Sequence, residues 1–172
     1  MRLVKTNYKA YDDMVKIQSY RELEVWQKSM NVVEVCYKLT KDFPKEEFYS
    51  LTNQIRRAAI SIPSNIAEGQ SRWSTKEFLR FLSIAKGSLS ELETQLILAQ
   101  RLDYLSEDKL NKTIDLTNEI GKMISGLRKS LIKKIFLNKH AWNSPFIRHE
   151  DIMNGGILEF EMKATPVDFT NK

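Results

Sequence analysis

The sequence is short of the residues from which disulfides, metal centres and membrane spans are built. It has one cysteine, Cys36, which excludes an internal disulfide and is typical of a reducing compartment. Its two histidines, His140 and His149, are too few for the Glu-x-x-His sites of di-iron bundles. No apolar run approaches the roughly eighteen residues of a membrane span, and the N-terminus has no signal-peptide core. We therefore expect a cytoplasmic protein with no membrane partner.

Signatures of catalysis are also missing. No glycine-rich phosphate loop follows a strand, because Gly121 and Gly126 fall inside a predicted helix. Glu91 and Glu93 are two residues apart and diverge on a helix, which does not suit paired-carboxylate chemistry. Cys36 lies near an apolar stripe and is expected to be a small core residue. We expect a non-enzymatic protein with no catalytic residue, metal or cofactor.

Helical periodicity fills the centre of the chain. Ser19, Ser74 and Ser106 are predicted N-caps, and Pro44 is predicted to open the second helix. Apolar residues follow at steps of three and four, which places them on one face of each helix. The predicted stripes are Leu23, Trp26, Met30, Val33, Tyr37 and Thr40; Phe48, Leu51, Ile55, Ala58, Ile62 and Ile66; Phe78, Phe81, Ala85, Leu89, Leu92, Leu96 and Ala99; and Leu110, Ile114, Thr117, Ile120, Ile124, Leu127 and Leu131.

Short loops between long helices favour antiparallel neighbours. The predicted fold is therefore all-α, an up-down-up-down four-helix bundle over residues 19–137. Residues 1–18 are interpreted as a flexible lead-in and 138–172 as an irregular tail. Within the tail, alternation over Leu158, Phe160 and Met162 indicates a short strand.

Apolar residues exceed the needs of one buried stripe. Leu79, Ile84 and Leu98 on the third helix and Ile60 on the second lie away from the stripes. They either thicken the core or form a subunit interface, since contiguous apolar patches mark contacts. We predict a homo-oligomer whose interface includes these four residues.

Positive charge is concentrated in the helical part. The chain has a formal net charge of +5, and the segment from Lys122 to Lys139 carries no acidic residue. Such charge is either a solvated face or a surface for polyanions, RNA or DNA. Of the adjacent pair Arg56 and Arg57, one is expected to pair with Glu68 or Glu91 and the other to bind phosphate. The predicted nucleic-acid-binding residues are Arg56, Arg57, Lys76, Arg80, Lys122, Arg128, Lys129, Lys133 and Lys134, with Lys86 as an extension.

Three motifs carry a family resemblance. Tyr20-Arg-Glu-Leu-Glu-Val-Trp-Gln-Lys, Ser61-Ile-Pro-Ser-Asn-Ile-Ala-Glu-Gly69 and the segment from Phe78 to Leu96 resemble the bacterial four helix bundle protein family. Its members include proteins encoded in intervening sequences of large-subunit ribosomal RNA genes. Others are accessory variability determinants of diversity-generating retroelements, which form a homopentameric barrel that binds a reverse transcriptase and nucleic acid.

The resemblance implies a homopentamer and an accessory role beside a reverse transcriptase. Two alternatives stay open from the sequence. The first alternative is a protein-interaction scaffold. The second is an intervening-sequence protein without nucleic-acid binding.

Overall fold

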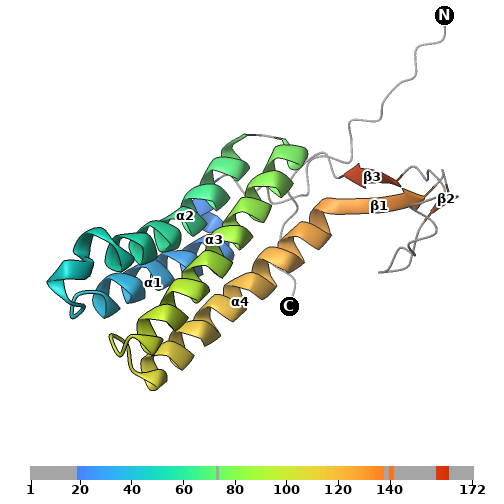
Figure 1. The fold of residues 1–172 in the computed structure, drawn as a ribbon. Helices are drawn as coiled ribbons and strands as arrows, with labels where there is room; N and C mark the ends of the chain where they lie inside the picture. The colour runs from blue at the N-terminus through green and yellow to red at the C-terminus, as the bar shows by residue number, and fades with distance from the viewer. Residues whose placement is uncertain (1–18, 73, 138–139, 142–157, 163–172) are drawn as a thin grey trace, which may run out of the picture.

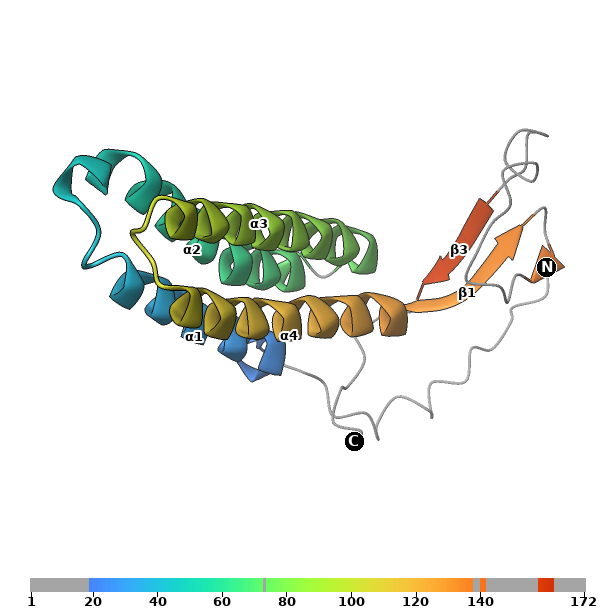
Figure 2. The ribbon, with the colours of Figure 1, turned by 60° about the horizontal axis from the view of Figure 1, so that its bottom comes forward.

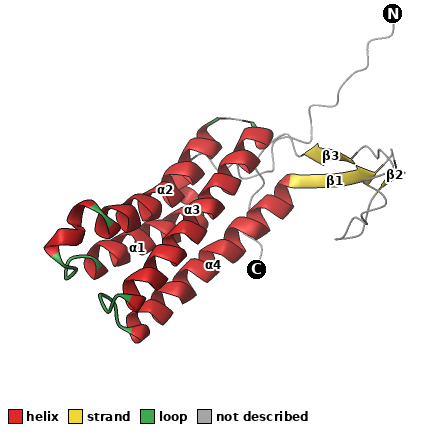
Figure 3. Cartoon of the chain, viewed as in Figure 1, coloured by secondary structure: helices red, strands yellow, loops and turns green. Residues whose placement is uncertain are grey.

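Four antiparallel helices form the body of the molecule. The computed structural model describes residues 19–72, 74–137, 140–141 and 158–162. The helices are α1 (Glu24–Leu39), α2 (Leu51–Ser71), α3 (Thr75–Arg101) and α4 (Glu107–Leu131). They lie side by side, with the α1–α2 and α3–α4 connections at the same end of the bundle (Figures 1 and 3). The predicted four-helix bundle is confirmed.

Serine side chains begin two of the helices as predicted. Ser74 Oγ accepts a hydrogen bond from the Glu77 N–H at 3.4 Å, and Ser106 Oγ accepts one from the Lys109 N–H at 3.5 Å. Ser19 instead caps a 3₁₀ turn over Tyr20–Glu22, so α1 begins only at Glu24. Likewise, Pro44 precedes a 3₁₀ turn over Lys45–Tyr49, and α2 begins after it.

The core lies along the predicted stripes of α2, α3 and α4. Ile55, Ile62 and Ile66 of α2 are fully buried, and α2 continues through the buried Pro63. In α3 and α4 the buried apolar residues are Phe78, Leu82, Ala85, Leu89, Leu92, Leu96, Ala99, Leu110, Ile120, Ile124, Leu127 and Leu131. Burial of these side chains supplies the main driving force for bundle formation.

Helix α1 is turned relative to the prediction. Its buried residues are Val25, Ser29, Val32 and Cys36. The middle of the predicted stripe, from Trp26 to Tyr37, is one residue further along and therefore about 100° around the helix. Met30 and Tyr37 of that stripe are exposed, and Trp26 and Val33 are half-buried, whereas its end residues Leu23 and Thr40 are buried as predicted. Ser29 and Cys36 have short side chains, which let α1 approach the core closely.

A small sheet follows the bundle. Strand β1 (Ile132–Leu137) continues directly from α4 and pairs antiparallel with β2 (His140–Ala141) and β3 (Leu158–Met162), in the order β2-β1-β3. Figure 2 shows β1 leaving the end of α4 beyond the helices. The strand predicted around Phe160 is confirmed.

The sequence extends the helical segment to Leu137, whereas the structure ends α4 at Leu131. The reason is pairing at long range, since Ile135 lies opposite Phe160 in the sheet. The predicted lead-in over residues 1–18 lies outside the described residues.

Candidate nucleic-acid interface

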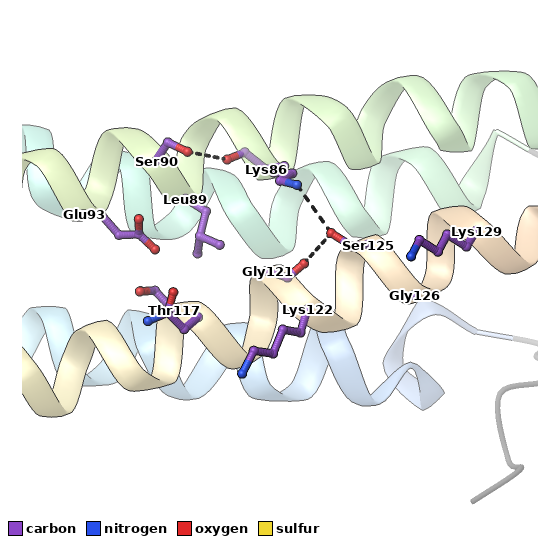
Figure 4. Close-up of a pocket in the computed structure, with 11 residues that line it drawn as sticks. Lys86, Leu89, Ser90, Glu93, Thr117, Gly121, Lys122, Ser125, Gly126 and Lys129 are labelled. Carbon is purple, nitrogen blue, oxygen red and sulfur yellow. Dashed lines mark hydrogen bonds between the residues drawn. The ribbon is translucent and has the colours of Figure 1, made fainter. Parts of the chain in front are cut away.

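A groove runs between α3 and α4 on the surface of the bundle. It has a volume of about 530 Å³, and Figure 4 shows side chains from both helices along it. We refer to it as the α3–α4 groove. Its lining residues are Lys86, Leu89, Ser90, Glu93, Thr117, Asn118, Gly121, Lys122, Ser125, Gly126 and Lys129.

Small residues on α4 keep this groove open. A Cβ atom built on Gly126 would have no neighbour within 4 Å, and one on Gly121 would lie 3.3 Å from Leu89 Cδ2. Ser125 is also short, and its hydroxyl donates to the Gly121 carbonyl at 2.8 Å. The surface of α4 is therefore open around Gly126.

Lysines supply the charge of the groove. Lys86, Lys122 and Lys129 are exposed, and Lys86 Nζ donates to Ser125 Oγ at 3.4 Å. None of the three makes an ion pair within the part of the chain that the structure describes. By contrast, Lys28, Lys38, Arg72, Arg80 and Lys112 pair with carboxylates. Within the described residues, the positive charges of the groove lysines are therefore not neutralised by a carboxylate.

The groove has two electrostatically different ends. Glu93 lies at one end and Lys129 at the other (Figure 4). The Glu93 carboxylate repels phosphate, whereas Lys86, Lys122 and Lys129 attract it. The cationic end, around Ser125 and Gly126, is therefore the part of the groove that suits a phosphate chain.

The other predicted cations are dispersed over the surface. Arg56 is half-buried, with its Nε donating to Thr40 Oγ1 at 2.8 Å and its guanidinium 4.7 Å from the centre of the Tyr37 ring. The predicted carboxylate pairing is wrong for this residue. Glu68 pairs with Arg72 at 2.5 Å, and Glu91 accepts a hydrogen bond from Gln95.

Arg57 and Lys76 are exposed, and Arg80 forms an ion pair with Glu77 at 3.5 Å. Arg128 is half-buried, and its buried Nε makes no hydrogen bond. Lys133 and Lys134 lie on β1 rather than on a helix, and their side chains lie outside the description. Within the described residues, the groove thus brings together Lys122, Lys129 and Lys86, the last of which was predicted as an extension of the basic surface.

The predicted interface residues occupy different surroundings. Ile60, Ile84 and Leu98 are exposed, at 41%, 42% and 46%, whereas Leu79 is half-buried against the core. Ile60 faces α1, where it lines a separate groove with Trp26. The predicted interface therefore stays a prediction, in which Ile60, Ile84 and Leu98 are exposed and Leu79 is not.

Sequence reasoning missed the polar and small residues of the groove, Ser90, Thr117, Asn118 and Ser125. Thr117, Gly121 and Ser125 recur every four residues, which places three small residues on one face of α4. That spacing is the signal in the sequence that marks an open helix face.

Other site types have no support in the described residues. No group of three or more histidine, cysteine, aspartate or glutamate side chains is arranged there to hold a metal ion. Among the helices described, none combines the length and apolar character needed to cross a bilayer.

A family model now places the chain among known proteins. The model of the 23S rRNA-intervening sequence protein matches residues 21–126. The chain belongs to this family. The match includes α1, α2, α3 and most of α4, and hence most of the groove of this intervening-sequence protein.

A solved structure from the S23 ribosomal protein family of Bacteroides thetaiotaomicron VPI-5482, described as a protein with unknown function, is also similar. It is 26% identical, with a TM-score of 0.57, and the alignment covers 61% of this chain and 98% of that one. Comparison with curated proteins gives no significant match.

Proposed function

We propose that this intervening-sequence protein is a non-enzymatic accessory protein that binds nucleic acid through the α3–α4 groove. The observation that carries the proposal is that Lys86, Lys122 and Lys129 lie along one groove without carboxylate partners among the described residues. Phosphate contacts of this kind give affinity without sequence specificity and weaken as salt rises.

In this proposal the protein acts as a homo-oligomer. The family resemblance favours a pentamer, in which the α3–α4 grooves of all subunits contact one RNA or DNA strand. Exposed Ile84 and Leu98 on α3 support self-association, because both leave apolar surface open to solvent on the single chain. Repetition of the groove around a ring would raise the local concentration of a bound strand. A reverse transcriptase is the proposed partner enzyme. Light scattering tests the oligomer, and a monomer at micromolar concentration would contradict it.

The test of nucleic-acid binding is a charge reversal in the groove. The triple variant Lys86→Glu, Lys122→Glu and Lys129→Glu is expected to lower RNA affinity by about 100-fold and to reduce the log–log salt slope by about 3. Binding is measured by fluorescence anisotropy between 50 and 200 mM salt, concentrations over which phosphate contacts change affinity by orders of magnitude.

The matched control reverses three exposed lysines outside the groove, Lys38→Glu, Lys41→Glu and Lys45→Glu. It changes the net charge equally, so a loss caused by overall charge alone would appear in both variants. Equal losses, or no loss in either variant, would contradict the proposed site.

The second candidate is a protein-interaction scaffold. It is favoured by the exposed Ile84 and Leu98, which would then contact a different protein. It predicts that the natural chain binds RNA negligibly even at low salt, which the same anisotropy experiment measures.

A further inference from the structure

An uncharged groove lies between α1 and α2. This α1–α2 groove has a volume of about 330 Å³, and none of the side chains that line it carries a charge. Its apolar lining includes Trp26, Met30 and Val33 of α1 and Ile60 of α2. Met30 and Ile60 are exposed, at 37% and 41%. Because apolar surface is stabilised by removal from water, the groove suits an apolar occupant and not a polyanion.

Helix α3 carries exposed apolar residues on a line along its surface. Ile84 and Leu98 are exposed, and Glu91, also exposed, is midway between them in the sequence. A spacing of seven residues is close to two turns, so the three residues share one side of the helix. We refer to Ile84, Glu91 and Leu98 as the α3 ridge. Glu91 accepts a hydrogen bond from Gln95 Nε2 at 3.1 Å but makes no ion pair among the described residues.

The charge of the ridge has a counterpart beside the groove. Arg57 is exposed on α2, one turn before Ile60, and it makes no ion pair within the described part of the chain. Opposite charges at the rim of a contact fix its register and guide association. The ridge and the groove are therefore complementary in charge as well as in apolar character.

Contacts within one chain place both charges at the same level of the bundle. Ser61 Oγ of α2 and Ser88 Oγ of α3 lie 2.8 Å apart, and the two helices are antiparallel. Arg57 comes four residues before Ser61, and Glu91 comes three residues after Ser88. Both charged residues are therefore about one turn from this contact, in the same direction.

The apolar parts agree on the other side of the same contact. Ser64, which lines the groove, comes three residues after Ser61. Ile84 of the ridge comes four residues before Ser88. Both are about one turn from the contact, in the direction opposite to the charges. Copies related by rotation about an axis along the bundle keep these levels, so ridge and groove would meet in register.

Two different surfaces on one chain suit a head-to-tail contact. Pairing groove with groove about a two-fold axis would leave both ridges exposed, whereas pairing ridge with groove covers both surfaces. We propose that the α3 ridge of one copy packs into the α1–α2 groove of the next copy. Ile84 then lies in the groove near Ser64, and Glu91 pairs with Arg57 of the next copy. The inference rests on the homo-oligomer of the proposed function and names the surfaces that form it.

The first test is complementation between two double variants. The ridge variant carries Ile84→Asp and Leu98→Asp, and the groove variant carries Met30→Asp and Ile60→Asp, all at exposed positions. Each variant keeps one intact surface but has no partner for it in its own kind, so we expect each to be a monomer by light scattering. An equimolar mixture can form one ridge-to-groove contact, and we expect a heterodimer that does not grow further.

The matched control carries Leu102→Asp and Leu116→Asp, which are also at exposed positions but belong to neither surface. It is expected to keep the oligomer of the natural chain. Circular dichroism checks that every variant keeps its helices. A mixture that stays monomeric, or equal dissociation of the control, would overturn the ridge-to-groove contact.

The second test changes only charge and leaves the apolar surfaces intact. Arg57→Glu alone and Glu91→Arg alone each bring like charges together across the contact, and each is expected to weaken self-association about tenfold. The two single variants are then mixed. Contacts between unlike chains again pair opposite charges, although positions 57 and 91 of each chain still carry like charges. We expect the mixture to associate within about threefold of the natural chain.

Recovery in the mixture cannot come from a contact within one chain, so it identifies the pair as one between copies. No recovery, or no effect of either single variant, would overturn the pairing of Glu91 with Arg57. The two levels of proposal fail differently. A natural chain that is a monomer at micromolar concentration contradicts the homo-oligomer itself, whereas an oligomer that survives the ridge and groove variants contradicts only the assignment of these surfaces.

Discussion

Helix α3 has two sides that are built differently, and glycine serves opposite purposes on them. Against α2, a Cβ atom on Gly69 would lie 2.5 Å from Phe81 Cβ and 3.0 Å from Phe78 Cδ2. Against α4, a Cβ atom on Gly126 would touch nothing within 4 Å. Glycine thus lets α2 and α3 approach closely on one side, and it leaves an open groove on the other.

The polar groups of the two sides differ in the same way. Between α2 and α3, Ser61 Oγ and Ser88 Oγ lie 2.8 Å apart, and Asn65 Nδ2 donates to the Ser61 carbonyl at 2.7 Å. On the other side of α3, Lys122 and Lys129 of α4 are exposed and have no ion-pair partner among the described residues. Polar groups satisfied within the protein serve stability, whereas unpartnered cations on a groove are available to a ligand.

The largest expected effect on stability is at the closely packed contact between α2 and α3. Gly69→Ala forces a methyl group against the Phe81 Cβ, an atom that cannot move without the backbone of α3. We expect a loss of about 3 kcal/mol in the free energy of unfolding, typical of overpacking. Urea denaturation followed by circular dichroism measures it.

Gly126→Ala is the matched control, because it makes the same chemical change in open space. It is expected to stabilise the protein by about 0.5–1 kcal/mol through higher helix propensity. If both variants changed the free energy of unfolding equally, the contrast between the two sides of α3 would be wrong.

A substitution at Gly126, in the α3–α4 groove, separates the effect on RNA binding from the effect on stability. Gly126→Glu places a carboxylate beside the groove lysines without a steric conflict. RNA affinity is expected to fall about tenfold, equivalent to 1.4 kcal/mol, while the urea midpoint does not decrease. Gly126→Gln has a similar size without the charge and should retain most of the affinity. A loss as large with glutamine would indicate that size, and not charge, determines binding.

The dependence of stability on acid pH tests the end of the bundle that contains the α1–α2 and α3–α4 connections. The pKa of Glu47 is lowered by hydrogen bonds from Ser50 Oγ, the Leu51 N–H and Tyr104 OH. A carboxyl group with a lowered pKa stabilises the fold above its unfolded pKa of about 4.3, and this contribution is lost as pH falls through the lowered value. Glu47→Gln should therefore flatten the stability profile below about pH 5.

Thermal melts between neutral and acid pH measure this effect. Asp115→Asn, at an exposed position on α4, serves as the control and should leave the shape of the curve unchanged. An unaltered acid limb in Glu47→Gln would mean that the hydrogen bonds around this carboxylate do not contribute to folding.

The sequence predicts those helices best in which size and hydrophobicity agree. In α3, Leu89, Leu92 and Leu96 are both large and buried. In α1 the two criteria disagree, because the buried face contains Ser29 and Cys36 while Met30 and Tyr37 are exposed. Hydropathy selects the larger residues, but close approach between helices selects the smaller ones. No local pattern decides between them.

The candidate site was also only partly predictable from the sequence. Lys86, Lys122 and Lys129 are recognisable from charge alone, but nothing in the sequence places Lys86 and Ser90 of α3 beside α4. Their proximity depends on how α3 and α4 pack. Strand β1 has the same limitation, since Ile135 pairs with Phe160, far along the chain. Long-range pairing overrides local periodicity in such segments.

The smallest expected effect lies at Gly121, which is intermediate between the two other glycines. A Cβ atom there would lie 3.3 Å from Leu89 Cδ2, the end of a flexible side chain that can shift slightly. Helix propensity favours Gly121→Ala by about 1 kcal/mol, and displacement of Leu89 costs a similar amount. We expect the free energy of unfolding to change by less than about 0.5 kcal/mol and RNA affinity by less than about twofold. A loss near that of Gly69→Ala would show that the α3–α4 side is as closely packed at this point as the α2–α3 side, and the groove would then begin only beyond Gly121.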